Sequence, residues 1–189
     1  MPYSPPPHLD AILAAGRRFA FEMPSDYRVG ELLRTLAASK PGGRFLELGT
    51  GLGLSLAWLR DGMDADATVL SLDNEARYVD FVADCFAFDQ RVSVVCTDGA
   101  AWLDAYPGGG FDLIFADTWP GKYHHLDAAL SLLLPGGIYV IDDMLPQENW
   151  PEGHARKAAA LLERLTADPN LIGCRLDWST GVFLAVRRP

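Results

Sequence analysis

Apolar positions follow two different periods along the chain. Over the first forty residues they recur every three or four positions, which is the spacing of an amphipathic helix. One such stretch covers residues 9–20 and another covers 29–37, with Pro24-Ser25-Asp26 between them. The spacing predicts two helices, so we expect residues 1–40 to form a helical N-terminal extension or lid ahead of the first strand.

From Arg44 onward, short apolar runs alternate with helical stretches. The predicted strands are 44–48, 67–73, 91–96, 111–117, 137–143, 171–177 and 181–187, and the predicted helices are 53–60, 75–88, 99–105, 123–134 and 153–167. Alternating strands and helices are typical of a parallel sheet covered on both faces. The last two strands are joined only through Ser179-Thr180-Gly181, which permits an antiparallel hairpin. We therefore expect a Rossmann-like, doubly wound α/β fold: a mostly parallel seven-stranded sheet in a core at 41–189.

Size and composition limit the class of protein. The chain has 189 residues, of which 49% are hydrophobic and 22% are charged, so we expect one domain with a packed core over residues 1–189. The formal charge of -9 repels phosphate backbones and anionic membranes and makes nucleic acid an unlikely partner. No apolar run approaches the ~18 residues of a membrane span, and no signal peptide is recognisable.

The cysteines suggest a compartment. Cys85, Cys96 and Cys174 are odd in number, far apart and without C-x-x-C spacing. They are therefore predicted to be reduced core residues of a cytoplasmic protein.

The most specific motif is a strand that ends near an acid and is followed by a glycine-spaced turn at the start of a helix. It reads Phe45-Leu46-Glu47-Leu48-Gly49-Thr50-Gly51-Leu52-Gly53. Glycines let the backbone pass close beneath a ligand, and the helix N-terminus offers free N–H groups. The alternative is a turn that serves packing alone.

Two further acids end the next two strands. Asp73 lies twenty residues after Gly53, where a carboxylate accepts hydrogen bonds from both hydroxyls of a ribose. Asp98 closes the following strand, where it can accept from an adenine amino group. Each acid alone is explained by a solvated strand end or a helix cap, but acids on three successive strands favour a nucleoside ligand.

Two other enzyme classes use similar turns. The dinucleotide fingerprint requires Gly or Ala where this chain has Leu54, which disfavours NAD. A hydrolase elbow would use Ser55, but this residue lies inside the predicted helix and the closing glycine of that motif is missing.

A third group of acids ends the strands 111–117 and 137–143. If these strands are neighbours, their ends lie ~5 Å apart, and the carboxylates of Asp117, Asp142 and Asp143 can converge on one cation. Oxygen donors of this kind suit Mg²⁺. The alternative is that Asp142 or Asp143 caps the segment that follows.

The segment after Asp117 contains the candidate bases. Lys122 is a candidate general base for a hydroxyl, with a surface lysine at a helix start as the alternative. His124 and His125 point to different sides of the predicted helix, so at most one of them faces the site and can replace Lys122. His154, on the later loop that leads into the last predicted helix, has two interpretations: it borders the substrate, or it is a solvent-facing helix cap.

Two tryptophans complete the candidate acceptor site. Trp119 and Trp150 offer apolar walls for a flat substrate, although aromatic residues at strand ends are commonly part of the core rim.

The order of these motifs resembles the class I S-adenosylmethionine-dependent methyltransferases, specifically the catechol and caffeoyl-CoA O-methyltransferase type. The resemblance runs from Met23 to the final hairpin. It implies a cofactor site whose methionine, ribose and adenine contacts come from Met23, Ser25, Glu47, Gly49, Thr50, Gly51, Gly53, Ser55, Asp73, Asn74, Asp98, Gly99, Ala100, Asp117 and Trp119.

The resemblance also implies the catalytic end. Asp117 and Lys122 would be catalytic, and the metal ligands would be Asp117, Asp142 and Asp143. The chain departs from the family at Asp143, where Asn is usual, and at Lys122, because the catechol type has its lysine two residues nearer the aspartate.

The resulting hypothesis is O-methylation of a small-molecule hydroxyl, assisted by a divalent cation, by a monomer or homodimer. The alternatives are methylation of a nucleoside hydroxyl in RNA, which needs a basic docking face, and a non-catalytic protein that only binds the cofactor.

Overall fold

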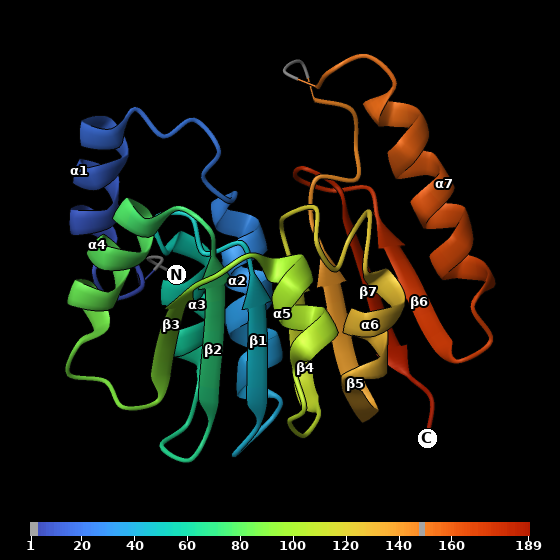
Figure 1. Cartoon of the computed structure of the whole chain (residues 1–189), viewed down its shortest axis with the longest axis horizontal. Coiled ribbons are helices and arrows are strands. Elements are labelled where there is room, and N and C mark those ends of the chain that lie inside the picture. Colours follow the sequence, from blue (N-terminus) through green and yellow to red (C-terminus); the bar gives the residue numbers. More distant parts are fainter. Residues whose placement is uncertain (1–3, 148–149) are drawn as a thin grey trace.

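The computed structural model describes residues 4–147 and 150–189, and its strands form one seven-stranded sheet in the order β3-β2-β1-β4-β5-β7-β6 (Figure 1). The strands are β1 (Arg44–Leu48), β2 (Thr68–Asp73), β3 (Val92–Cys96), β4 (Phe111–Ala116), β5 (Leu133–Ile141), β6 (Leu171–Leu176) and β7 (Val182–Arg187). The helices are α1 (Leu9–Phe19), α2 (Tyr27–Ala38), α3 (Leu54–Gly62), α4 (Ala76–Phe86), α5 (Gly99–Ala105), α6 (Leu126–Ser131) and α7 (His154–Ala167).

Strand pairing confirms the predicted fold class. Strands β1 to β5 pair in parallel, whereas β7 runs antiparallel to both β5 and β6. Two predicted segments fall partly outside the described residues: 1–3 of the extension and 148–149 of the loop before α7. Within the described part, no helix has the length and apolar character that a bilayer crossing requires.

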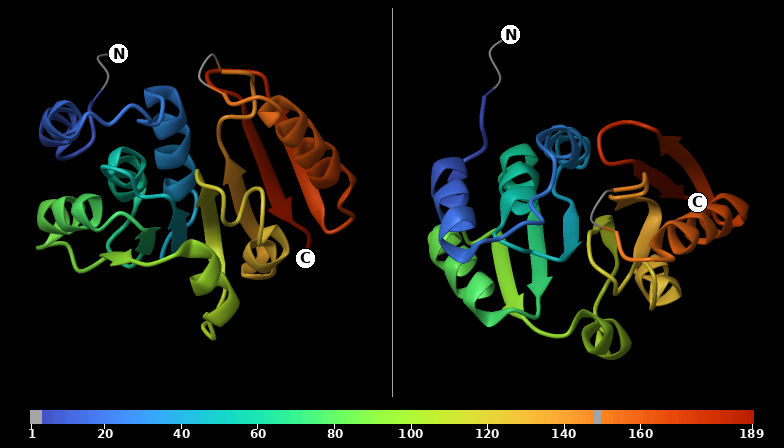
Figure 2. Two further views of the ribbon diagram at one scale, coloured as in Figure 1. Left: turned by 45° about the horizontal axis from the view of Figure 1, so that its top comes forward. Right: turned by 90° about the horizontal axis from the view of Figure 1, so that it is seen from above.

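Helices cover both faces of the sheet, as the view from above shows (Figure 2). Successive residues of a strand point to opposite faces. Phe45 and Phe115 belong to the core cluster beneath α1 to α4, while Leu46 and Ile114 belong to the cluster beneath α5 to α7. Both faces of the sheet are therefore buried, which explains why the central strands appear in the sequence as continuous apolar runs.

Helix α2 is part of the first core layer. Val29 and Leu33 are fully buried, and Gly30 approaches α3 so closely that a Cβ atom there would lie 2.2 Å from the Trp58 ring. The second half of the predicted extension is therefore packed against the core as tightly as the helices that follow it.

Two sequence predictions are wrong in detail. The predicted helix 123–134 is reduced to α6, because His125 has a positive φ angle of 55° and forms the N-cap directly before Leu126. Strand β5 consequently begins at Leu133, four residues before the predicted strand.

Two of the three cysteines are not core residues, whereas Cys85 packs against the core cluster beneath α1 to α4. Cys96 and Cys174 are exposed because they lie on β3 and β6, the two edge strands, and Cys85 is partly buried on α4. All three are free.

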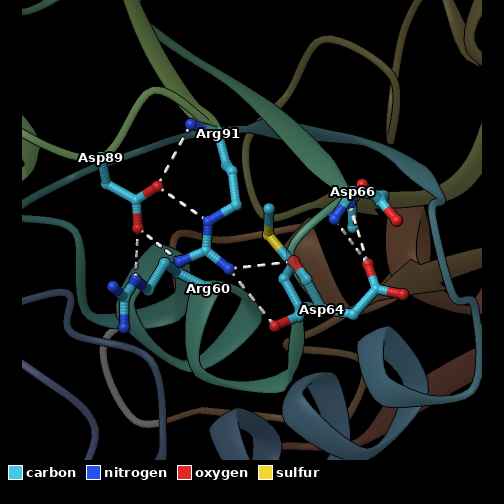
Figure 3. A network of polar contacts seen from close by, with 7 residues as sticks. Arg60, Asp64, Asp66, Asp89 and Arg91 are labelled. Carbon is cyan, nitrogen blue, oxygen red and sulfur yellow. Dashed lines mark hydrogen bonds and ion pairs between the residues drawn. The ribbon is translucent and has the colours of Figure 1, made fainter.

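A charged network joins the N-terminal ends of two strands to α3 (Figure 3). Asp89 accepts hydrogen bonds from Arg91 at 2.5 and 2.8 Å and from Arg60 Nε at 2.6 Å. Arg91 also donates to the Asp64 carbonyl at 2.9 Å. The network fixes the start of β3 against α3 and the loop that leads to β2.

This network predicts a pH-dependent contribution to stability. Arg91, and then Arg60, hold the pKa of Asp89 well below its usual range. A carboxylate whose folded pKa is depressed stabilises the fold above its unfolded pKa and loses that contribution as the pH falls. We expect Asp89→Asn to lower the free energy of unfolding by about 1–3 kcal/mol at neutral pH. The difference in the free energy of unfolding between Asp89→Asn and wild type should become smaller below about pH 4.

Urea denaturation at several pH values measures this difference. The matched control is Asp177→Asn, which breaks the exposed ion pair with Arg175 and should leave stability unchanged. If Asp89→Asn lowers the free energy of unfolding by the same amount at low pH as at neutral pH, the depressed pKa of Asp89 is contradicted.

Candidate functional site

A cleft of about 880 Å³ lies at the C-terminal edge of the parallel strands. Its lining comes from α1, the segment 21–26, the glycine-rich turn after β1, the ends of β2 and β4, and the segments that surround Asp142 and His154. Elements from both halves of the chain thus meet in one cavity.

The glycine-rich turn forms one end of the cleft. Gly49 and Gly51 have φ angles of 99° and 50°, in the region that favours glycine. A Cβ atom on Gly49 would approach the Asp117 carbonyl oxygen to 3.1 Å, so the turn lies directly against the end of β4. The Gly51 amide donates to Asp73 Oδ2 at 2.8 Å, which fixes the Asp73 carboxylate beside the turn.

Glu47 lies beneath this turn and is absent from the cleft lining. Its Oε2 accepts from the Ser71 hydroxyl at 2.5 Å, and Ser71 Oγ lies 2.6 Å from Thr50 Oγ1. Burial raises the pKa of Glu47 to about 7, against the lowering effect of the Ser55 and Ser71 hydroxyls. Glu47 therefore supports the turn from below and does not line the cleft.

A small cavity of about 60 Å³ adjoins the turn on the side of β3. Asp98, Gly99 and Asn74 line it, together with Pro120. Asp98 also accepts from the Ala101 amide at 2.8 Å and so caps α5. The helix-cap interpretation of Asp98 is therefore confirmed, while its contact with an adenine stays a prediction.

The segment before α2 covers part of the cleft. Met23 and Ser25 line it, and Ser25 Oγ donates to Asp117 Oδ2 at 3.4 Å. The N-cap of α2 is Asp26, whose carboxylate accepts from the Arg28 amide at 2.8 Å. Ser25 thus links the N-terminal segment to the end of β4.

Most of the other predicted cofactor residues line one of the two cavities, namely Thr50, Ser55, Asp117 and Trp119. Gly53 and Ala100 line neither cavity. Gly53 instead precedes α3, where a Cβ atom would lie 3.0 Å from the Val82 side chain.

The opposite end of the cleft holds a buried lysine among acids. Lys122 is only 4% exposed, and its Nζ donates to the Asp142 carbonyl at 2.5 Å. The alternative of a surface lysine is therefore wrong. Burial, and then the carboxylate of Asp142, raise the pKa of Asp117 well above its usual range, and burial raises the pKa of Asp142 to about 6.

The arrangement does not fit a divalent cation. The Lys122 ammonium already supplies a positive charge to Asp117 and Asp142. The Asp142 carboxylate accepts hydrogen bonds from the Thr180 hydroxyl and from the Asp143 amide. In residues 4–147 and 150–189, no three His, Cys, Asp or Glu side chains are grouped as a metal site requires.

The histidine pair after Lys122 lies outside the cleft lining, which agrees with the prediction that at most one of the two faces the site. His124 Nδ1 and His125 Nδ1 are 2.8 Å apart, and His125 Nε2 lies 3.3 Å from Asp104. The predicted helix that would have carried them does not form at these residues.

The described structure reveals a different histidine in the cleft. His154 begins α7 and lines the cleft, with its Nε2 atom 2.9 Å from the Tyr123 hydroxyl. Trp119 and Trp150, the predicted apolar walls, also line the cleft, with ring centroids 6.1 and 4.5 Å from that of His154. Tyr123 was not a sequence candidate, and its position directly after Lys122 was the only available signal.

Comparison with known proteins supplies independent evidence. Residues 46–144 match a family model described as a methyltransferase domain. A relative from Mycobacterium avium (strain 104), named as a candidate O-methyltransferase, is 28% identical over 94% of this chain and 86% of its own length.

Solved structures share the fold. A candidate O-methyltransferase from Klebsiella pneumoniae superposes with a TM-score of 0.84 at 24% identity, covering 100% of this chain and 92% of the other. An O-methyltransferase from Bacillus cereus in complex with S-adenosylhomocysteine superposes with a TM-score of 0.80 at 20% identity. The match covers 95% of this chain and 90% of the other.

Glu47 gives the site a testable pH signature. An acid whose folded pKa is raised costs no stability below its unfolded pKa, and it destabilises the fold increasingly as the pH rises from the unfolded pKa to the folded pKa, above which the cost is constant. A shift from 4.5 to about 7 corresponds to about 3 kcal/mol. We therefore expect the advantage of Glu47→Gln over wild type in the free energy of unfolding to grow between about pH 5 and about pH 8.

Denaturant titrations of wild type and Glu47→Gln at both pH values measure this change in the free energy of unfolding. The control is Glu163→Gln, at an exposed position, which should show the same pH dependence as wild type. A pH dependence that is the same in Glu47→Gln and in wild type would show that the Glu47 carboxyl titrates normally.

Proposed function

Because this chain belongs to the family of methyltransferase domains, we propose that it transfers the methyl group of S-adenosylmethionine to a hydroxyl group of a small molecule. The observation that carries this proposal is the continuity of the cleft. One cavity of about 880 Å³ joins the glycine-rich turn and Asp73 to Lys122 and the acids around it. Donor and acceptor can therefore bind end to end.

The first half of the cleft suits the cofactor. The Asp73 carboxylate, anchored by the Gly51 amide, is available to the ribose hydroxyls, and the small cavity beside Asp98 offers space at the adenine end. The methionine end then points toward Ser25 and Asp117. A sulfonium ion there is attracted by the acids that surround it.

Lys122 supplies charge where the acceptor reacts. A phenol-like hydroxyl with a pKa near 10 is only about 0.1% ionised at pH 7. A buried ammonium group that faces the acceptor oxygen stabilises the negative charge that develops on it. The oxygen then attacks the methyl carbon in line, the O–CH₃ bond forms and the S–CH₃ bond breaks.

Several observations support the choice of a small hydroxyl acceptor in the cytoplasm. The relative from Mycobacterium avium bears an O-methyltransferase name. The net charge of -9 disfavours RNA as the acceptor. Three free cysteines, two of them exposed, suit a reducing compartment.

Calorimetric titration with S-adenosylhomocysteine tests the cofactor site. We expect wild type to bind and Asp73→Asn to bind ~10- to 100-fold more weakly, because an amide replaces a charged acceptor of hydrogen bonds. The exposed Asp80→Asn on α4 is the matched control and should bind like wild type. The absence of binding to wild type, or equal binding by Asp73→Asn, would overturn the proposed function.

The role of Lys122 predicts the response to cations. Because its ammonium group supplies positive charge at the acceptor end of the cleft, we expect methyl transfer with added Mg²⁺ and with EDTA to differ by less than about twofold. Initial rates of transfer from methyl-labelled S-adenosylmethionine measure this. A loss of activity in EDTA that Mg²⁺ restores would instead establish the cation site that the sequence predicts at Asp117, Asp142 and Asp143.

A further inference from the structure

Tyr123 and His154 meet at the acceptor end of the cleft from segments far apart in the chain. Tyr123 follows Lys122 in the segment after β4, whereas His154 opens α7. The Tyr123 hydroxyl lies 2.9 Å from His154 Nε2, and the two ring centroids are 5.0 Å apart in an edge-on arrangement. Both residues line the same cleft as Asp117, so this pair borders the space where the acceptor reacts.

Packing alone does not explain His154. The side chain is 9% exposed and enclosed by the rings of Trp119 and Trp150. Its Nδ1 atom is buried without a hydrogen-bond partner in the part of the chain that the structure describes. An incompletely paired imidazole destabilises a buried site, and an apolar ring of similar size would fill the space without that cost.

Burial and the charges around the imidazole keep it in the neutral form, whose ring has one nitrogen with a free lone pair. Burial, and then the ammonium groups of Lys122 and Lys157, lower the pKa of His154, and Asp143 opposes them. His154 is therefore neutral at pH 7. Burial, with Asp143 and Asp117, raises the pKa of Tyr123 to about 12, so its hydroxyl keeps its proton in the resting protein.

Lys122 is engaged elsewhere in this arrangement. Its Nζ atom donates to the Asp142 carbonyl 2.5 Å away and is directed toward that backbone oxygen. A base is still required, because an acceptor hydroxyl must lose its proton during methyl transfer.

On the basis of the proposed function, we propose that Tyr123 and His154 form a relay that removes the proton of the acceptor hydroxyl. The acceptor O–H proton passes to the Tyr123 oxygen as the Tyr123 proton passes to His154 Nε2. The acceptor oxygen keeps the electron pair and forms the O–CH₃ bond, while the S–CH₃ electrons return to sulfur. The positive charge lost by the sulfonium reappears on the imidazole, so net charge in the cleft is unchanged.

Nitrogen NMR of histidine-labelled protein saturated with S-adenosylhomocysteine tests the relay without any acceptor. Because Nε2 must accept from Tyr123, we expect His154 at neutral pH to carry its hydrogen on Nδ1, with the lone pair on Nε2. His154→Gln assigns the signal, and Tyr123→Phe should shift it. A hydrogen on Nε2, or an imidazolium at neutral pH, would overturn the proposal.

Kinetics provide the second arm, using methyl-labelled S-adenosylmethionine and the acceptor that wild type methylates. We expect His154→Gln and Tyr123→Phe each to lower kcat by ~10²-fold or more while the affinity for S-adenosylhomocysteine stays within about twofold. In wild type, kcat should rise with pH through the depressed pKa of His154, and this rise should vanish in His154→Gln.

The matched control is His125→Gln, outside the cleft lining, which should behave like wild type. An unchanged kcat, or an unchanged pH profile, in His154→Gln would overturn the relay. Loss of S-adenosylhomocysteine binding by wild type would instead count against the proposed function, so the two failures are distinguishable.

Discussion

The site depends on the parallel register of four strands. Leu48 of β1 pairs with both Leu72 of β2 and Ala116 of β4, and Ala116 pairs with Ile141 of β5. The next residue on each strand therefore falls in one row at the same edge of the sheet. That row consists of Gly49, Asp73, Asp117 and Asp142. Backbone hydrogen bonds between the strands thus place the glycine-rich turn and three acids at one edge of the sheet.

Buried acids make this row electrostatically demanding, and one lysine offsets part of the cost. The pKa values of Glu47, Asp117 and Asp142 are all raised, primarily by burial. Lys122 is 4% exposed, is held by the Asp142 carbonyl, and lowers the pKa values of Asp117 and Asp142 through its positive charge. The same ammonium group that makes these acids tolerable is therefore in place to stabilise negative charge on an acceptor, which connects the stability of the site to its proposed chemistry.

The sheet was predictable from sequence because the parallel strands are buried on both faces and stand out as apolar runs. The strand-end acids followed from the same pattern, since a strand boundary fixes where its last side chain lies. Helix 123–134 was mispredicted because its apolar spacing does not show that His125 takes the left-handed conformation that interrupts it.

Contacts that depend on loop paths could not be predicted. Tyr123 and His154 are 31 positions apart, and their hydrogen bond depends on how the chain returns from β5 to α7. The burial of Lys122 and the position of Glu47 beneath the turn likewise follow from packing. The exposed cysteines were missed because the sequence alone did not identify β3 and β6 as edges.

The most direct test of the central claim, that one cleft holds donor and acceptor end to end, is a crystal structure of the protein with S-adenosylhomocysteine. We predict the adenine beside Asp98, the ribose hydroxyls on Asp73, and the sulfur directed toward Asp117 and Lys122. A cofactor bound elsewhere, or one whose sulfur points away from Lys122, would contradict it.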